Sequence, residues 1–552
     1  MTTSPATYRE QRPASTAGQT VRRVIVFTLL FTLVVITATG IQSLVALLLE
    51  SGTTIVGTET STVAQALAFT LVGGPIAAAL WWFVWRRAAE PGERGAVAWG
   101  LYLAAVLIVS LIAFTTALLG TAAALVGGDW EASSFSTGIV WAAVWVWHRW
   151  MWRHPFRGSI RLATVPSVLG AAFGLIVGVS GTLGALSGLF DAAISGFTAA
   201  STIGGPWWEG PLGSLVWAIG GGAVWVWHWF MERAGATVTG LSNVALVALG
   251  ILGGTLITLG GIATALFVAL RLLFDSADPI RELLAPLPLA IAAAAIGAIV
   301  WVYHRGVADL RSPSTRQAGV LATSGVALVA AASGIGVIVN SALGILVEPL
   351  AGGDTRTLLL GGLSVLLVGG PVWWLTWRPL SPADAAESST GRRIYLIAVF
   401  GLSAVVALIT LLVIGFRLFE VFLDGGSDLV DQIRAPLGLL TATVLVAGYH
   451  FTVWRHDRAD AIASAPTVRP RTIGDVILVT AADPAPLAEA IESTSGAAVT
   501  VWRRATQGTQ GTSVESAPDP DVLARALEGV SGNRVLVVLG PGDRLDVIPL
   551  AD

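Results

Sequence analysis

Long apolar stretches alternate with short polar segments along most of the chain. Six of these stretches are long, and each is followed by a shorter one that ends in aromatic residues. The long stretches lie at 21–50, 95–127, 160–189, 240–273, 318–350 and 393–423, and the shorter ones at 60–87, 135–153, 212–233, 283–305, 357–378 and 432–455. A helix crosses the hydrocarbon core of a bilayer with about 20 consecutive apolar residues. The pattern therefore predicts about twelve transmembrane helices in six helical hairpins.

The six hairpins resemble one another where their second helices end. These ends read LWWFVWR, WHRWMWR, WHWFMER, YHRGVAD, VWWLTWR and YHFTVWR. The aligned positions lie 67 to 80 residues apart and are Trp81, His148, His228, His304, Trp373 and His450. Self-similarity at a nearly fixed period indicates tandem structural units. We therefore expect an all-α polytopic membrane bundle with tandem hairpin repeats at about 21–87, 95–153, 160–233, 240–305, 318–378 and 393–455.

The ends of the chain differ from this membrane domain, which we place at 21–456. Residues 1–20 are polar and rich in Ser, Thr and Pro, which predicts a disordered N-terminus. The apolar run that follows is too long for a signal-peptide core. Charge and proline rise at 457–472, which we interpret as a linker. Residues 473–552 follow the order β-α-β-α-β-β, which predicts a small cytoplasmic α/β domain.

Composition and charge narrow the class of protein. The 552 residues are 54% hydrophobic and 12% charged, whereas soluble domains carry about 25% charged residues. The net charge of −3 argues against a nucleic-acid partner, and the absence of cysteine excludes disulfides and thiolate chemistry. The spans have no charged residue at their centres, which argues against proton-coupled transport.

Arginine predicts the orientation of the chain. About 20 arginines flank the starts of first helices and the ends of second helices, whereas the loops inside the hairpins hold five and are acidic. Positive charge in short loops marks the cytoplasmic side of a membrane. We therefore expect a multi-pass protein of the bacterial plasma (inner) membrane, with both termini in the cytoplasm.

The stretch WVWHRWMWRH at 145–154 poses the main question about chemistry. Tryptophan and arginine are typical of the membrane–water interface, where they contact lipid headgroups. On this interpretation the interface residues are Trp81, Trp145, His148, Arg149, Trp152, Trp227, His228, Trp301, His304, Arg305, Trp373, His450 and Trp454. Alternatively, the four aligned histidines converge on a metal or a proton path, or His and Arg together bind a headgroup or small-molecule phosphate.

Two observations weigh on these alternatives. Two of the six repeats carry tryptophan in place of histidine, which argues against a metal site. We also predict no catalytic residue and no cofactor. Asn340, deep in the ninth span, is the most notable intramembrane polar residue. It is expected to form an interhelical hydrogen bond or, alternatively, to contact a substrate.

The motif W-x-[WY]-H occurs as WVWH at 145–148 and 225–228 and as WVYH at 301–304. It resembles a family of bacterial polytopic membrane proteins that is catalogued only as a domain of unknown function. The resemblance covers roughly residues 21–458 and implies a membrane protein without assigned catalytic residues. The first and fifth repeats depart from the motif at the histidine.

Three functions remain open from the sequence. We favour a structural, sensory or scaffolding membrane protein, whose partners are the lipid bilayer and a cytoplasmic protein bound through 473–552. The first alternative is a transporter or channel for a neutral or lipidic solute. The second is a membrane enzyme that acts on lipid headgroups, which would require the His-Arg ends to converge with a carboxylate, Glu232 or Asp309.

Overall fold

A computed structural model gives the fold in two compact units, Met1–Phe451 and Thr452–Asp552. The first 15 residues, most of the N-terminal segment expected to be disordered, lie outside the described residues, and residues 16–20 belong to the first helix. The described residues are 16–50, 60–197, 206–275, 278–345, 355–377, 389–424, 429–463, 473–481, 483–503, 520–527, 530, 532–540 and 544–550.

Long helices occupy all twelve predicted spans. In chain order they are α1 (Thr16–Glu50), α2 (Thr60–Ala68) with η1 (Phe69–Gly73) and α3 (Gly74–Arg87), α5 (Val97–Val126), α6 (Ala132–Trp152), α7 (Val165–Phe197), α8 (Glu209–Val226) with η2 (Trp227–Met231), α9 (Gly240–Ala245) with η4 (Leu246–Gly253) and α10 (Gly254–Phe274), α12 (Leu287–Asp309), α13 (Pro313–Gly344), α14 (Thr355–Trp377), α16 (Ser389–Asp424) and α17 (Leu429–Ala463). Shorter helices lie between them: α4 (Pro91–Arg94), η3 (Ala234–Ala236) and α11 (Ile280–Leu284).

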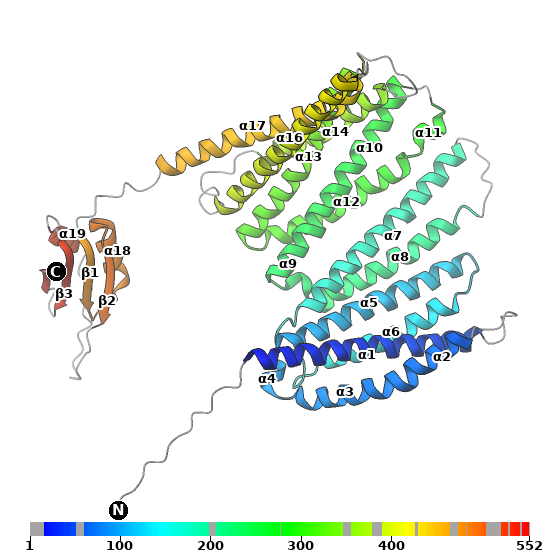
Figure 1. Ribbon diagram of the computed structural model, residues 1–552, viewed down its shortest axis with the longest axis horizontal. Helices are drawn as coiled ribbons and strands as arrows, with labels where there is room; N and C mark the ends of the chain where they lie inside the picture. Colours follow the sequence, from blue (N-terminus) through cyan, green and yellow to red (C-terminus); the bar gives the residue numbers. More distant parts are fainter. Residues whose placement is uncertain are drawn as a thin grey trace, which may run out of the picture. The chain divides into compact units, whose positions relative to one another are not determined.

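Consecutive hairpins lie side by side in a row (Figure 1). Helix α1 packs on α5 and α6, α5 on α7 and α8, α7 on α12, α10 on α14, and α13 on α16. Among the described residues, the extensive helix contacts all join members of one hairpin or of two consecutive hairpins. Each hairpin therefore depends mainly on its nearest neighbours, as in other repeat proteins.

Glycine allows the two helices of a hairpin to approach closely. In the third hairpin, a Cβ atom added to Gly178 of α7 would lie 2.9 Å from the backbone nitrogen of Gly222 on α8. In the fourth, a Cβ atom on Gly254 would lie 2.9 Å from the backbone nitrogen of Trp301. In a bilayer, apolar side chains gain little by moving from lipid into a helix interface. Helices therefore associate largely through close packing, which small residues allow because they let the backbones approach each other.

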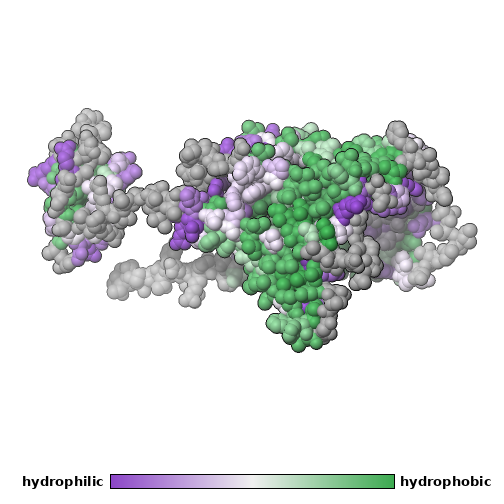
Figure 2. All heavy atoms as spheres, turned by 90° about the horizontal axis from the view of Figure 1, so that it is seen from above, coloured by the Kyte–Doolittle hydropathy of each residue, from purple (hydrophilic) through white to green (hydrophobic). Residues whose placement is uncertain are grey.

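Ten of the described helical segments are long and apolar enough to cross a membrane. They include every predicted span except the second helices of the second and third hairpins, α6 and the α8–η2 segment. These two are helical as predicted, but tryptophan, histidine, serine and glycine make them less hydrophobic. Apolar side chains also cover much of the helical surface in Figure 2. Both observations fit a multi-pass membrane protein.

The second unit contains a small mixed sheet. Its elements are β1 (Ile473–Thr480), α18 (Ala485–Ser495), β2 (Ala498–Arg503), α19 (Pro520–Leu527), β3 (Gly532–Gly540) and β4 (Arg544–Leu550), in the predicted order. The strand order is β2-β1-β3-β4; β1 is parallel to β2 and β3, and β4 is antiparallel to β3. The two helices and the central strands enclose a separate apolar core.

The expected linker at 457–472 is only partly described. Helix α17 continues to Ala463, so residues 457–463 are helical and not a loop. A helix that begins in the membrane can continue into water when its outer turns are polar, and residues 455–460 are RHDRAD. Residues 464–472 lie outside the described part of the chain.

Candidate functional site

The four aligned histidines share one local geometry. All four side chains are buried, with exposed fractions between 0 and 3%. Each Nδ1 atom lies 2.8 or 2.9 Å from the carbonyl oxygen four residues earlier, and that residue is a valine in every case: Val144, Val224, Val300 and Val446. A backbone carbonyl can only accept a hydrogen bond, so Nδ1 carries the proton. Neutral histidine in this tautomer leaves Nε2 as an acceptor.

The surroundings of Nε2 differ among the four repeats. The hydroxyl of Tyr102 lies 3.0 Å from Nε2 of His148 and donates to it. Nε2 of His228 lies 3.7 Å from a carboxylate oxygen of Glu232. Nε2 of His304 and of His450 has no hydrogen-bond partner among the described residues. The shared feature is therefore the bond to the histidine's own helix, and not one common ligand.

The aromatic residues of the motif join consecutive hairpins. The ring of His228 lies 6.5 Å from that of Trp145, one hairpin earlier. In the next pair, Trp229 Nε1 donates to the hydroxyl of Tyr303 at 2.7 Å. In the last pair, Trp377 Nε1 donates to the hydroxyl of Tyr449 at 2.9 Å. The repeated motif therefore lies at the contact surfaces between repeats.

The repeats that lack histidine use tryptophan at the same junction. The ring of Trp81 lies 4.9 Å from that of Trp147, and its Nε1 lies 3.2 Å from the sulfur of Met151. The ring of Trp373 lies 5.4 Å from that of Tyr449. These two tryptophans thus pack against the following hairpin, whereas the aligned histidines contact rings of their own or the preceding hairpin.

The row of hairpins keeps the four histidines apart. Each of them belongs to a different hairpin and contacts aromatic rings of its own or the preceding one. No group of three or more histidine, cysteine or acidic residues in the described part of the chain could hold a metal ion. The four imidazoles therefore have separate surroundings in the described part of the chain.

The other predicted interface residues lie at the ends of the second helices. Arg149 stacks over the rings of Trp145 and Trp227, at 5.4 and 5.0 Å from their centroids. Arg305 stacks over Trp301 at 5.1 Å. Of these predicted interface residues, Trp227 and Arg305 are exposed. The other predicted tryptophans are partly buried: Trp81, Trp145, Trp152, Trp301, Trp373 and Trp454.

Glu232 forms the main polar cluster of this region. Its carboxylate is 2% exposed and lies 3.0 Å from Arg149 and 3.2 Å from Arg153, both from the preceding hairpin. The adjacent cavity, lined also by His228, measures about 10 Å³, which is room for about one water molecule. The convergence of His, Arg and a carboxylate that an enzyme would need is therefore present here, but as a closed ion-pair cluster.

Asn340 lies where α13 meets α17. Its side-chain oxygen is buried and has no hydrogen-bond partner among the described residues. A Cβ atom on Gly438 of α17 would lie 3.3 Å from the backbone nitrogen of Asn340. One turn earlier on α17, Nη1 of Arg434 is likewise buried without a hydrogen-bond partner. The predicted polar position therefore belongs to a tight helix contact.

Glu232 was expected from the sequence as a candidate carboxylate, but its ion pairs with Arg149 and Arg153 of the preceding hairpin were not predicted. Glu232 follows His228 by four residues, a spacing that places both on one helical face. The π-helical turn η2, which contains His228, has no sequence signature.

Comparison with known proteins gives a family-level result only. Residues 23–147 and 318–449 match the model of a family described as a domain of unknown function (DUF5671). No curated protein and no solved structure is similar enough to count as a match. Each matched region spans two consecutive hairpins, the first with the second and the fifth with the sixth. In these two regions, each of which contains four long helices, the chain is therefore similar to a family of unknown function.

Proposed function

We propose that this protein is a structural or sensory scaffold of the bacterial inner membrane, whose C-terminal α/β domain binds a cytoplasmic protein. The observation that carries this proposal is that domain, which has its own apolar core and follows the last long helix of the membrane unit. The arginine distribution supports the cytoplasmic placement of both termini.

The edge strand β2 is the proposed contact surface. It pairs with β1 on one side and is the last strand of the sheet on the other. Its side chains are largely exposed, including Trp502 at 58% and Val501 at 37%. An exposed edge strand with apolar side chains is a template for pairing with a strand of another protein.

The membrane unit serves as the platform in this proposal. Its recurrent histidine and tryptophan side chains form contacts between consecutive hairpins, which favours a role in holding the row together. The small cavity beside Glu232 has too little room for a lipid headgroup, so this cluster also supports a structural role.

The proposal is tested by placing a photo-crosslinking residue at Trp502 in the full-length chain in cells. The control carries the same residue at Glu492, an exposed position on α18. We expect a discrete protein adduct from position 502 that the control does not give, and the captured protein should then bind the purified full-length chain. Identical adducts from both positions, or none from 502, would contradict the proposal.

A second candidate is a transporter for a neutral solute, and Asn340 is the observation that favours it. Its buried carbonyl oxygen and the buried Nη1 of Arg434 both have unused hydrogen-bonding capacity on neighbouring helices. Asn340→Leu would remove the acceptor. If purified protein in vesicles transports a solute and this variant abolishes transport without loss of folded protein, transport replaces scaffolding as the function.

A further inference from the structure

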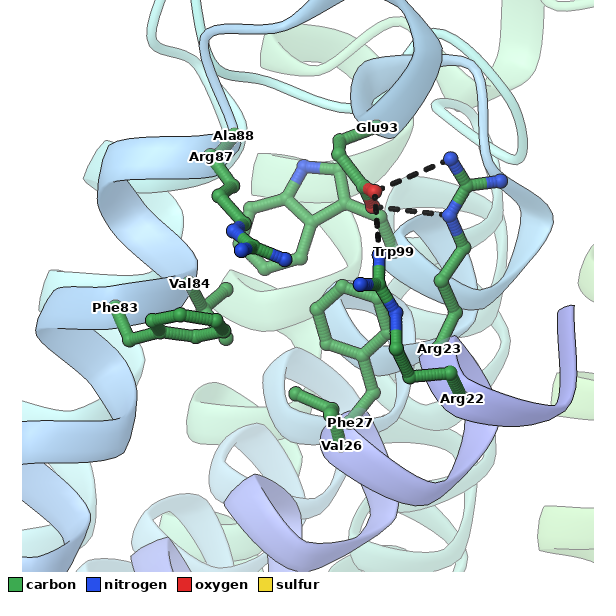
Figure 3. A pocket seen from close by; sticks show the side chains of 10 residues that line it. All are labelled: Arg22, Arg23, Val26, Phe27, Phe83, Val84, Arg87, Ala88, Glu93 and Trp99. Atoms are coloured by element: carbon green, nitrogen blue, oxygen red, sulfur yellow. Dashed lines mark hydrogen bonds and ion pairs between the residues drawn. The ribbon is translucent and has the colours of Figure 1, made fainter. Parts of the chain in front are cut away.

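A pocket of about 150 Å³ opens at the end of the first hairpin (Figure 3). Its walls come from the start of α1, the end of α3, the short helix α4 and the start of α5. Figure 3 shows the guanidinium groups of Arg22 and Arg87 reaching toward its centre from opposite sides, with Trp99 at the back. The pocket thus combines cationic groups with apolar walls.

The charges of the pocket do not cancel. Arg23 is occupied, because its Nε and Nη2 atoms each lie 3.1 Å from a carboxylate oxygen of Glu93, and Nη2 also donates to the carbonyl of Gly92 at 3.2 Å. Arg22 lies 3.8 Å from the same carboxylate, and its side chain is 55% exposed. Three arginines and one glutamate leave two positive charges, which lie at Arg22 and Arg87. An anion is the ligand that these charges favour.

The remaining walls are apolar. Phe83 lies under the guanidinium group of Arg87, at 4.2 Å from the ring centroid. Phe27 and Trp99 form the inner wall, with their ring centroids 5.4 Å apart. Pockets that enclose a whole small-molecule ligand measure about 300–1,000 Å³. The present volume is smaller, so the pocket has room for a charged headgroup but not for a whole ligand of that kind.

The pocket is a feature of the first hairpin and not of the repeat. In the fifth hairpin, which is the corresponding hairpin of the second matched region, VWWLTWR aligns with LWWFVWR, and Pro379 then corresponds to Arg87. With the starts of the two matched regions aligned, Ala318 corresponds to Arg23 and Gln317 to Arg22, and Arg316 precedes Gln317. Packing common to both regions therefore does not require these arginines.

We propose that this pocket binds the phosphate group of an anionic amphiphile, with Arg22 and Arg87 as its two cationic contacts. Glu93 holds Arg23 and α4 in place and so shapes the polar side of the pocket. The phosphate belongs either to a phospholipid of the bilayer or to a soluble phosphate ester. This binding site goes beyond the proposed scaffold and does not depend on the C-terminal domain.

The test uses full-length protein in phosphatidylcholine nanodiscs that contain a fluorescent phosphatidic acid. We expect Arg22→Gln with Arg87→Gln to weaken binding of phosphatidic acid about tenfold or more, because each lost charge contact removes a charge-assisted hydrogen bond. Arg86→Gln is the matched control. Arg86 lies on the same turn and stacks on Trp82 at 3.8 Å, but it does not line the pocket. Its variant should bind like the wild type.

Further measurements separate the outcomes. Thermal unfolding of each variant checks that the first hairpin remains folded, and the single variant Arg22→Gln offers a milder change if the double variant unfolds. Equal binding by the pocket variants and Arg86→Gln would overturn the proposal, since binding would then be general surface attraction. If binding is specific, competition by glycerol phosphate identifies a soluble ester as the ligand, and a lack of competition identifies the phospholipid.

Discussion

At the residue scale, the main feature of the repeated motif is that its histidine side chains are buried. In the four repeats that contain the histidine, Nδ1 donates a hydrogen bond to a backbone carbonyl of the same helix. Nε2 faces surroundings that differ from repeat to repeat. At His148 and His450, each one residue beyond the end of a region that matches the family, the neighbour is a tyrosine: Tyr102 lies opposite His148 and Tyr395 opposite His450, with ring centroids 5.8 and 6.2 Å apart. Only the first pair forms a hydrogen bond, at 3.0 Å.

This difference predicts unequal effects of removing the two hydroxyl groups. Tyr102→Phe leaves a buried Nε2 without its donor, which should lower the free energy of unfolding by about 1–2 kcal/mol. Tyr395→Phe removes no hydrogen bond to histidine and should cost less. Unfolding of the purified protein by SDS, followed by tryptophan fluorescence, measures both. Equal losses would mean that ring packing, and not the hydrogen bond, stabilises the pair.

The recurrence of aromatic and histidine residues was evident from the sequence, but their surroundings were not. Helical spacing places Trp141 and His148 on one face and Trp147 and Trp150 on another, and the structure buries the first pair and exposes the second. Spacing alone does not reveal whether a face meets lipid or the next hairpin. Anchoring to lipid headgroups and packing between hairpins therefore both lead to the same sequence pattern.

At the scale of the elements, close glycine contacts hold hairpins together, and the third hairpin offers a matched pair of positions. A Cβ atom at Gly178 would meet backbone atoms of α8 at 2.9 and 3.2 Å, whereas one at Gly222 meets nothing within 4 Å. Gly178→Ala should therefore lower the free energy of unfolding by about 1–3 kcal/mol. Gly222→Ala should be neutral or slightly stabilising, because alanine favours the helix. SDS unfolding compares them, and a larger loss for Gly222→Ala would refute this packing.

The Glu232 cluster joins the second and third hairpins. Glu232→Gln keeps the shape of the side chain but removes the charge that faces Arg149 and Arg153, which should cost about 1–3 kcal/mol. The value is below that of a fully buried pair because the Arg153 side chain is 49% exposed. Glu90→Gln, at an exposed position, is the control. If both variants unfold at the same SDS fraction, the cluster does not clamp the two hairpins.

Most elements could be predicted because each has a strong local pattern. Long apolar runs predicted the hairpin helices, and alternating residues with turn signals predicted the order of helices and strands along the C-terminal domain, but not the order β2-β1-β3-β4 within its sheet. The π-helical turns η1, η2 and η4 were missed, since one extra residue in a turn leaves the apolar pattern almost unchanged. The pocket at Arg22 and Arg87 was missed because its walls come from four helices, α1, α3, α4 and α5, whose relative positions the sequence does not specify.

On the scale of the whole molecule, the open question is how often the chain crosses the membrane. Ten segments are apolar enough, and α6 and the α8–η2 segment decide between ten and twelve crossings. In either case Trp130, before α6, lies outside and Leu310, after α12, lies inside if the N-terminus is cytoplasmic. The two alternatives differ at Phe156, after α6, and at Trp207, before α8. All four side chains are at least half exposed, so each position can be labelled.

The chain has no cysteine, so each single cysteine variant reports one position. With twelve crossings, an impermeant maleimide should label Trp130→Cys and Trp207→Cys from outside, and Leu310→Cys and Phe156→Cys only in inverted vesicles. With ten crossings, Phe156→Cys and Trp207→Cys exchange sides while the other two stay. We expect the first result, because α6 and the α8–η2 segment pair with α5 and α7 along their length (Figure 1) and a helix so paired shares the depth of its partner. The exchanged pattern would place both tryptophan-rich helices at the membrane surface.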